Sequence, residues 1–130
     1  MHGLEAWAEK LYTEIDEDRQ TLATVMAKTG IAPSTTRQTA AWISEKLAQA
    51  KVGFDDPGDG SLKRLELLEA LALGIEGKRA LWTALRAAAI KVPSLLGPDY
   101  AGLTERARRQ HDEVEGQRLQ AAAHAFADAA

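Results

Sequence analysis

Apolar side chains recur every three or four residues over long stretches of this chain, and Gly or Pro separates one stretch from the next. The longest stretch covers residues 62–91, where the recurring apolar residues are Leu65, Leu68, Ala72, Ile75, Trp82 and Leu85. This spacing places side chains on one face of a helix, whereas a half-buried strand would alternate every second residue. The pattern therefore predicts a long amphipathic helix.

The amino-acid composition favours the same structural class. The 130 residues include 25 Ala and 16 Leu but only 5 Ile and 4 Val. Alanine and leucine are strong helix formers, and the β-branched residues that favour strands are scarce. We therefore expect an all-α protein and not a sheet protein.

Three further stretches carry the helical pattern. They cover residues 3–28, ending at Gly30; residues 34–50, ending before Gly53; and the segment from about Asp99 to the Ala-rich C-terminal end. The connections between the four stretches are short, which favours antiparallel neighbours. We expect residues 1–130 to form one domain, an antiparallel up-down four-helix bundle.

Composition and charge exclude several classes of function. The chain has no Cys, so disulfides, thiolate metal sites and cysteine nucleophiles are excluded, and a reducing cytoplasm is the expected location. The formal net charge of −3 is not that of a nucleic-acid-binding protein. We expect the local Arg106, Arg108 and Arg109 group to be a solvated helix face. No signal peptide or membrane-spanning segment is visible, so no membrane partner is expected.

Three polar residues fall on or beside apolar stripes and are candidate metal ligands. Asp18 interrupts the series of the first helix, Glu69 lies next to Leu68, and His111 falls in the series of the last helix. Inward carboxylates and a His on facing helices are how a bundle holds a metal ion. The alternative is a buried polar network in which Asp18 or Glu69 pairs with Arg79 or Lys78, since charges near a core must be paired.

A second candidate is the stretch Asp55–Glu66, read against the twelve-residue calcium loop. Asp55, Asp59, Gly60 and Glu66 occupy positions one, five, six and twelve. However, Pro57 stands where a ligand is needed and Lys63 adds a cation at position nine. The alternative is a tight turn followed by Ser61 as helix cap, and we favour it.

Glycines and tryptophans on the helices are interpreted as packing features. The Gly74–Lys78 segment has two residues between its glycines instead of the four of a phosphate loop, and no strand precedes it. We therefore expect Gly74 and Gly77 to permit close approach of a helix or a Trp side chain. The tryptophans, Trp7, Trp42 and Trp82, are expected in the core, with a hydrophobic ligand pocket as the alternative.

The segment Leu65–Trp82 (LELLEALALGIEGKRALW) resembles small, uncharacterised bacterial proteins of the ferritin-like four-helix type. The resemblance, with the four-segment layout, covers most of the chain and implies the ferritin-like fold. In the metal-binding members it implies carboxylate and Glu-x-x-His ligands. This sequence has no Glu-x-x-His, so the fold is expected without the ferroxidase or storage chemistry.

We therefore expect a non-catalytic helical bundle with a structural or protein-interaction role and no cofactor. A homodimer or another protein is the expected partner. The alternative function is a ferritin-like metal-binding protein whose degenerate site uses Asp18, Glu69 and His111.

Overall fold

The computed structural model describes residues 2–30, 45 and 61–129 of the chain. Within these residues the structure is helical and contains no strand. Its elements are α1 (His2–Thr29), α3 (Ser61–Ala89), the short 3₁₀ helix η1 (Pro93–Leu95) and α4 (Tyr100–Ala129). The all-α class is confirmed for this part of the chain. The second expected helix lies outside the described residues, except for Glu45, which is helical and exposed.

The helix ends follow the local chemistry expected from the sequence. α1 ends at Thr29, and the next residue, Gly30, has φ +69°. This left-handed conformation closes a helix C-terminus at little cost only for glycine. At the start of α4, Asp99 is the cap. Its Oδ1 accepts the Gly102 N–H at 3.0 Å, and its carbonyl oxygen accepts the Leu103 N–H at 2.9 Å.

A tethered turn joins α3 to α4. The Tyr100 hydroxyl donates a 2.6 Å hydrogen bond to the carbonyl oxygen of Leu95, and both residues are buried. Leu95 therefore fills the end of the core while the backbone reverses direction around η1. Three aliphatic residues next to it point to solvent and form the apolar tip of the molecule: Ile90, Val92 and Leu96.

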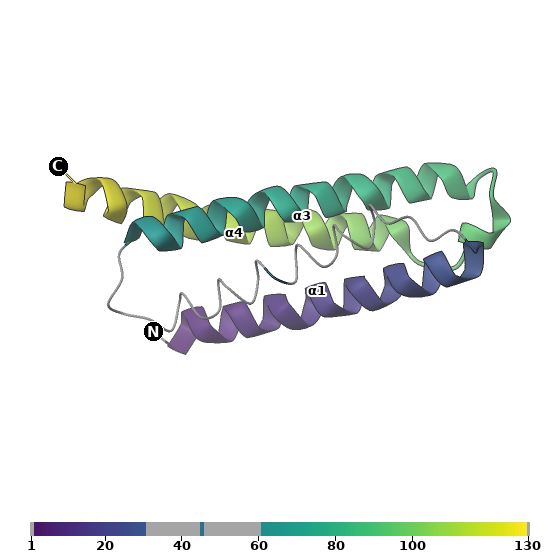
Figure 1. Cartoon of the computed structure of the whole chain (residues 1–130), viewed down its shortest axis with the longest axis horizontal. Coiled ribbons are helices and arrows are strands. Elements are labelled where there is room, and N and C mark those ends of the chain that lie inside the picture. Colours follow the sequence, from purple (N-terminus) through teal and green to yellow (C-terminus); the bar gives the residue numbers. More distant parts are fainter. Residues whose placement is uncertain (1, 31–44, 46–60, 130) are drawn as a thin grey trace.

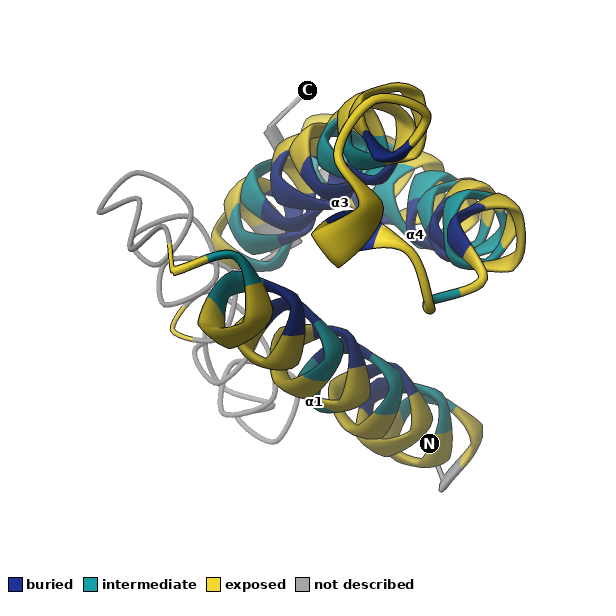
Figure 2. Cartoon of the chain, turned by 90° about the vertical axis from the view of Figure 1, so that its right-hand side faces the viewer, coloured by how far each residue is buried: buried dark blue, intermediate teal, exposed yellow. Residues whose placement is uncertain are grey.

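The three long helices run side by side, with α1 and α3 in the same direction and α4 in the opposite direction (Figure 1). The backbones of α3 and α4 lie close together, whereas α1 reaches them mainly through side chains. Small buried residues on the close pair, Ala72, Ala107 and Ala121, permit this short separation. The buried stripes of the three helices face one another across the interior (Figure 2).

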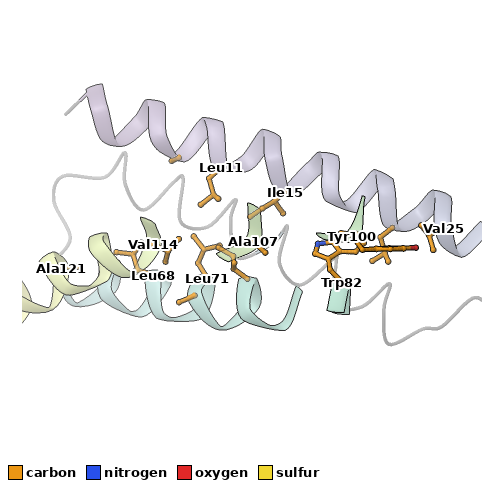
Figure 3. Close-up of a cluster of buried hydrophobic side chains, with 14 of the residues drawn as sticks. Leu11, Ile15, Val25, Leu68, Leu71, Trp82, Tyr100, Ala107, Val114 and Ala121 are labelled. Carbon is orange, nitrogen blue, oxygen red and sulfur yellow. The ribbon is translucent and has the colours of Figure 1, made fainter. Parts of the chain in front are cut away.

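One continuous apolar cluster fills that interior. Leu11, Ile15 and Val25 of α1 point toward the α3·α4 pair, and Trp82 lies against Tyr100 with ring centroids 6.2 Å apart (Figure 3). The expected core residues of all three helices are buried or partly buried, except Ala88, which is exposed. Trp7 and Trp82 pack as expected, and Trp42 lies outside the described residues.

The expectation of close packing at Gly77 is wrong. Gly77 is exposed, and a Cβ added there would meet nothing within 4 Å. Gly74 is buried, as a close approach requires. Gly116, in the middle of α4, is also exposed and open. At Gly77 and Gly116 the helices therefore carry glycine without a packing reason in the structure.

Candidate functional site

A buried ion pair crosses the interior between α1 and α3. Lys78 Nζ donates a 2.6 Å hydrogen bond to Oδ2 of Asp18 and a 2.5 Å hydrogen bond to Oε1 of Gln110 on α4. The exposed fractions of Asp18, Lys78 and Gln110 are 3%, 5% and 0%. One ammonium group therefore joins all three described long helices inside an otherwise apolar core.

Arg106 on α4 occupies the other carboxylate oxygen of Asp18. Its NH2 donates to Asp18 Oδ1 at 2.5 Å and to the carbonyl oxygen of Glu14 at 3.2 Å. Its NH1 lies 3.3 Å from Oε2 of Glu17, at the protein surface. Each oxygen of Asp18 is thus bound to a cation, which is the arrangement that a buried carboxylate needs.

A second set of hydrogen bonds continues from Gln110 toward the surface. Gln110 Nε2 donates to Oε1 of Glu14 at 3.0 Å, and Arg109 NH2 donates to Oε2 of the same carboxylate at 2.7 Å. Arg109 NH1 then donates to Glu113 at 2.9 Å, and the Trp7 indole N–H donates to Glu113 at 3.0 Å. These bonds connect α1 and α4 over about two helical turns of α1 and one turn of α4.

We call these side chains the polar cluster: Glu14, Asp18, Lys78, Arg106, Arg109, Gln110, Glu113 and Trp7. Its formal charges cancel, since three carboxylates face three cations. Burial lowers the pKa of the Lys78 ammonium, although the Asp18 carboxylate opposes the shift. Burial alone would raise the pKa of Glu14, but the hydrogen bonds from Gln110 and Arg109 outweigh it and lower that pKa. Burial likewise opposes the charge on Arg106, but its hydrogen bond to Asp18 prevails and raises its pKa.

The charged side chains of the polar cluster are bound to one another. Each carboxylate of the cluster bonds at least one of its cations, and three members, Arg106, Arg109 and Glu113, also line a cavity of about 450 Å³ at the surface of α4. Two buried N–H groups among the described residues lack a hydrogen-bond partner: Nε of Arg106 and Nε1 of Trp82. Trp82 packs against Tyr100, and Arg106 lines this cavity together with Arg109 and Glu113.

The other two candidate ligands lie elsewhere. Glu69 is exposed and His111 half-buried, and both line a groove of about 350 Å³ between α3 and α4. His111 Nε2 lies 3.9 Å from Oε2 of Glu76, whose pKa is lowered by its hydrogen bond from Arg79. The structure therefore brings Glu69 and His111 to one groove and leaves Asp18 in the core. Among the described residues, no group of three or more His, Asp or Glu side chains could hold a metal ion.

The positions of the charged residues confirm some of the expectations from the sequence and contradict others. The buried polar network is confirmed for the pair Asp18 and Lys78, whereas Arg79 pairs with Glu76 and not with Glu69. The solvated-face interpretation of the arginines is correct for Arg108, which bonds Glu105 and Asp112 on its own helix. It is wrong for Arg106 and Arg109, because both reach across to carboxylates of α1.

Sequence reasoning also missed Gln110, the most deeply buried polar residue in the described part of the chain. Gln110 lies three residues after Ala107 and four before Val114, so its place on the apolar stripe was a usable signal. Arg106, Arg109 and Glu14 carried no such signal, since each lies at the edge of a stripe. Of the calcium-like stretch, residues 55–60 lie outside the described part of the chain, and Glu66 is an exposed residue of α3.

Comparisons of the chain with protein-family models, with curated proteins and with solved structures found no match. No described helix combines the length and hydropathy that crossing a membrane would require. The polar cluster and the α3·α4 groove are therefore the features of the structure that bear on function.

Proposed function

We propose that the chain is a non-catalytic helical bundle that acts by binding protein. The observation that carries the proposal is a set of large apolar residues exposed on α3 and α4, at positions that the core does not need. These residues are Leu62 and Leu73 on α3 and Leu119 and Phe126 on α4. Leu73 is 72% exposed and Phe126 is 69% exposed. Apolar groups gathered on one face are typical of interaction sites.

This surface, which we call the outer face, surrounds the α3·α4 groove. Leu73 lines the groove, and Leu119 lies four residues, about one helical turn, after Glu115, another lining residue. No residue of α1 lines the groove. At about 100° per residue, Leu119 and Phe126 lie well around α4 from Arg106 and Glu113, which bond α1. The outer face therefore belongs to the side of the α3·α4 pair that α1 does not cover.

The polar cluster supports the same proposal from the inside of the molecule. A half-satisfied buried network would be costly, and only one register of α1, α3 and α4 pairs Asp18, Lys78 and Gln110 together. The cluster thereby selects one rigid arrangement of the three helices. A binding face benefits from such rigidity, because less conformational entropy is lost on association.

An antiparallel up-down four-helix bundle of ferritin-like type is the fold that we propose for the whole chain. The direction of α1, α3 and α4 agrees with the first, third and fourth helices of such a bundle (Figure 1). The sequence pattern over residues 34–50 predicts the remaining helix, and Glu45 within it is helical. A cytoplasmic location is part of the proposal, since a chain without Cys fits a reducing compartment.

The test compares outer-face and tip variants in the cells that produce the protein. The tagged chain should elute from a lysate at a mass well above 14.1 kDa. A photo-reactive residue at Leu119 should cross-link to protein, and Leu73→Asp should abolish both the cross-link and the larger mass. Ile90 is 85% exposed at the tip, so Ile90→Asp is the matched control and should change neither. Elution at the monomer mass without cross-links would overturn the proposal.

The alternative function, metal binding at a degenerate carboxylate and histidine site, has one supporting observation. Glu69 and His111 line the same groove, together with Glu76 and Glu115. Titration of metal-free protein with iron, manganese and zinc tests it, because a ligand of the folded state must raise the melting temperature. A shift that His111→Ala removes would support the alternative, and no shift with any of the three metals would exclude it.

A further inference from the structure

Polar residues of the outer face occur in matched levels on the two antiparallel helices. Glu76 Oε2 lies 3.9 Å from His111 Nε2. Glu69 lies seven residues before Glu76 on α3, and Arg118 lies seven residues after His111 on α4. The hydrogen bond from Arg118 to Glu115 raises the pKa of Arg118, and the charge of Glu69 adds a smaller effect in the same direction. Seven residues are close to two helical turns, so each helix presents these residues on one side. At these levels α3 contributes Glu69 and Glu76, and α4 contributes His111 and Arg118, with Glu115 between them.

Apolar residues also lie toward the open end of the helix pair. Leu62 lies seven residues before Glu69 on α3, and Phe126 lies eight residues after Arg118 on α4. Both side chains are more than half exposed. Leu73, also exposed, lies between the two charged levels. The face thus combines an apolar surface with two acids on α3, Glu69 and Glu76, and with His111, Glu115 and Arg118 on α4.

We propose that the occupant of this face is a second copy of the chain, which gives the protein-binding role above a specific partner and rests on it. The two copies are related by a two-fold axis parallel to α3 and α4. This axis lays α3 of each copy against α4 of the other at the same level. Glu69 then faces Arg118 of the second copy, Glu76 faces its His111, and Leu62 faces its Phe126.

Charge selects this two-fold axis over the other face-to-face arrangement. A two-fold axis perpendicular to the helices would lay α3 on α3, which brings the glutamates of the two copies toward each other. Like charges across an interface oppose association, and an isologous interface repeats every such contact twice. With the axis parallel to the helices, the Glu69 carboxylate instead meets the Arg118 guanidinium of the second copy, and this contact occurs twice.

Sedimentation and light scattering on the purified full chain give the first test. We expect twice the mass of 14.1 kDa at concentrations up to about 100 µM, and a concentration-dependent return toward the monomer on dilution. Phe126→Asp should weaken self-association by about tenfold or more, since it places a charge in the apolar part of the interface. Ile90→Asp changes an exposed residue of the tip and should leave the mass unchanged.

Charge reversal tests the pairing between the copies. Arg118→Glu should weaken the dimer, because two glutamates would then meet at the same level. Adding Glu69→Arg should restore the dimer, since the pair is rebuilt with its signs exchanged. A weakened dimer that the double variant does not recover would contradict the parallel axis.

Cross-linking tests the geometry independently, and the natural chain has no Cys to interfere. Leu62→Cys protein and Phe126→Cys protein are prepared separately, mixed and treated with a short bis-maleimide. The mixture should give a cross-linked dimer in greater yield than either protein alone. Ile90→Cys mixed with either protein should give none. Equal yields in every combination would contradict the proposed arrangement.

The outcomes separate this inference from the broader protein-binding role. A purified chain that stays monomeric throughout overturns the second copy as partner. If that monomer nevertheless elutes from the lysate at a larger mass that Leu73→Asp abolishes, the outer face binds a different protein. If it is monomeric in both settings, the protein-binding role fails as well.

Discussion

Lys78 Nζ and Asp18 Oδ2 lie 2.6 Å apart in the interior of the bundle, 60 residues apart in the chain, with both side chains almost completely buried. A buried ion pair is weak evidence for stability, because desolvation of two charges offsets their attraction. Its significance here is geometric. The pair joins α1 to α3, and Gln110 joins the same ammonium to α4.

Removing one partner of this pair should be strongly destabilising. Lys78→Met leaves the Asp18 carboxylate with Arg106 alone, and we expect the free energy of unfolding to fall by about 3–5 kcal/mol. The double variant Asp18→Leu/Lys78→Met should be less destabilised than the sum of the single variants, with a coupling energy of roughly 0.5–3 kcal/mol. Urea denaturation of all four proteins measures this cycle. Additive losses would show that the pair does not act as a unit.

Alanine at the open glycines should stabilise the helices. Nothing in the structure lies within 4 Å of a Cβ added at Gly77 or Gly116, so each Gly→Ala change should raise the free energy of unfolding by roughly 0.5–1 kcal/mol. Gly30→Ala is the matched control. It also meets no neighbour, but its φ of +69° should make alanine destabilising by about 1–2 kcal/mol. Thermal melting of the three variants distinguishes conformation from packing, and stabilisation by Gly30→Ala would contradict the assigned helix end.

The stability of the protein should fall in acid partly through Glu14. Burial opposes the charge of Glu14, but hydrogen bonds from Gln110 and Arg109 outweigh it, so the folded-state pKa lies below the ordinary value of 4.5. A carboxyl with a lowered pKa stabilises the fold above the unfolded-state pKa, and this contribution is lost as the pH falls through the folded-state value.

Glu14→Gln should therefore lower stability at pH 7 and reduce the further loss between about pH 5 and pH 3. Denaturation midpoints at several pH values measure both effects. The exposed residue Glu66 provides the control, and Glu66→Gln should leave the acid loss close to that of the natural chain. An unchanged acid loss in Glu14→Gln would show that Glu14 is not part of the acid response.

The cap of α4 gives a local prediction. Asp99→Ala removes the side-chain acceptor of the Gly102 N–H, and we expect a loss of about 1 kcal/mol. Asp112→Ala removes an exposed carboxylate in the middle of α4, which bonds only Arg108 at 3.4 Å among the hydrogen bonds described. That change should cost less than about 0.5 kcal/mol. Equal losses would mean that the cap bond adds nothing beyond surface charge.

Three of the expected helices and their ends could be predicted because the governing interactions are local. The stripe Leu65, Leu68, Ala72, Ile75 is formed within a few turns of one helix, and Gly30 and Asp99 act on the turn next to them. The place of Asp18 on an apolar stripe likewise predicted a buried polar residue. Residue types and their spacing therefore determined the all-α class, the helix ends and most of the core.

Only the tertiary structure decided which side chains meet. Lys78 could serve Asp18 or Glu69 on sequence grounds, and Arg106 and Arg109 looked like solvated residues. Their partners Asp18 and Glu14 are 88 and 95 residues away, so pairing depends on the register and rotation of packed helices. The same rotation carries Glu69 and His111 to the outer face while Asp18 turns inward. Helical periodicity specifies a face, but the neighbouring helix determines what that face contacts.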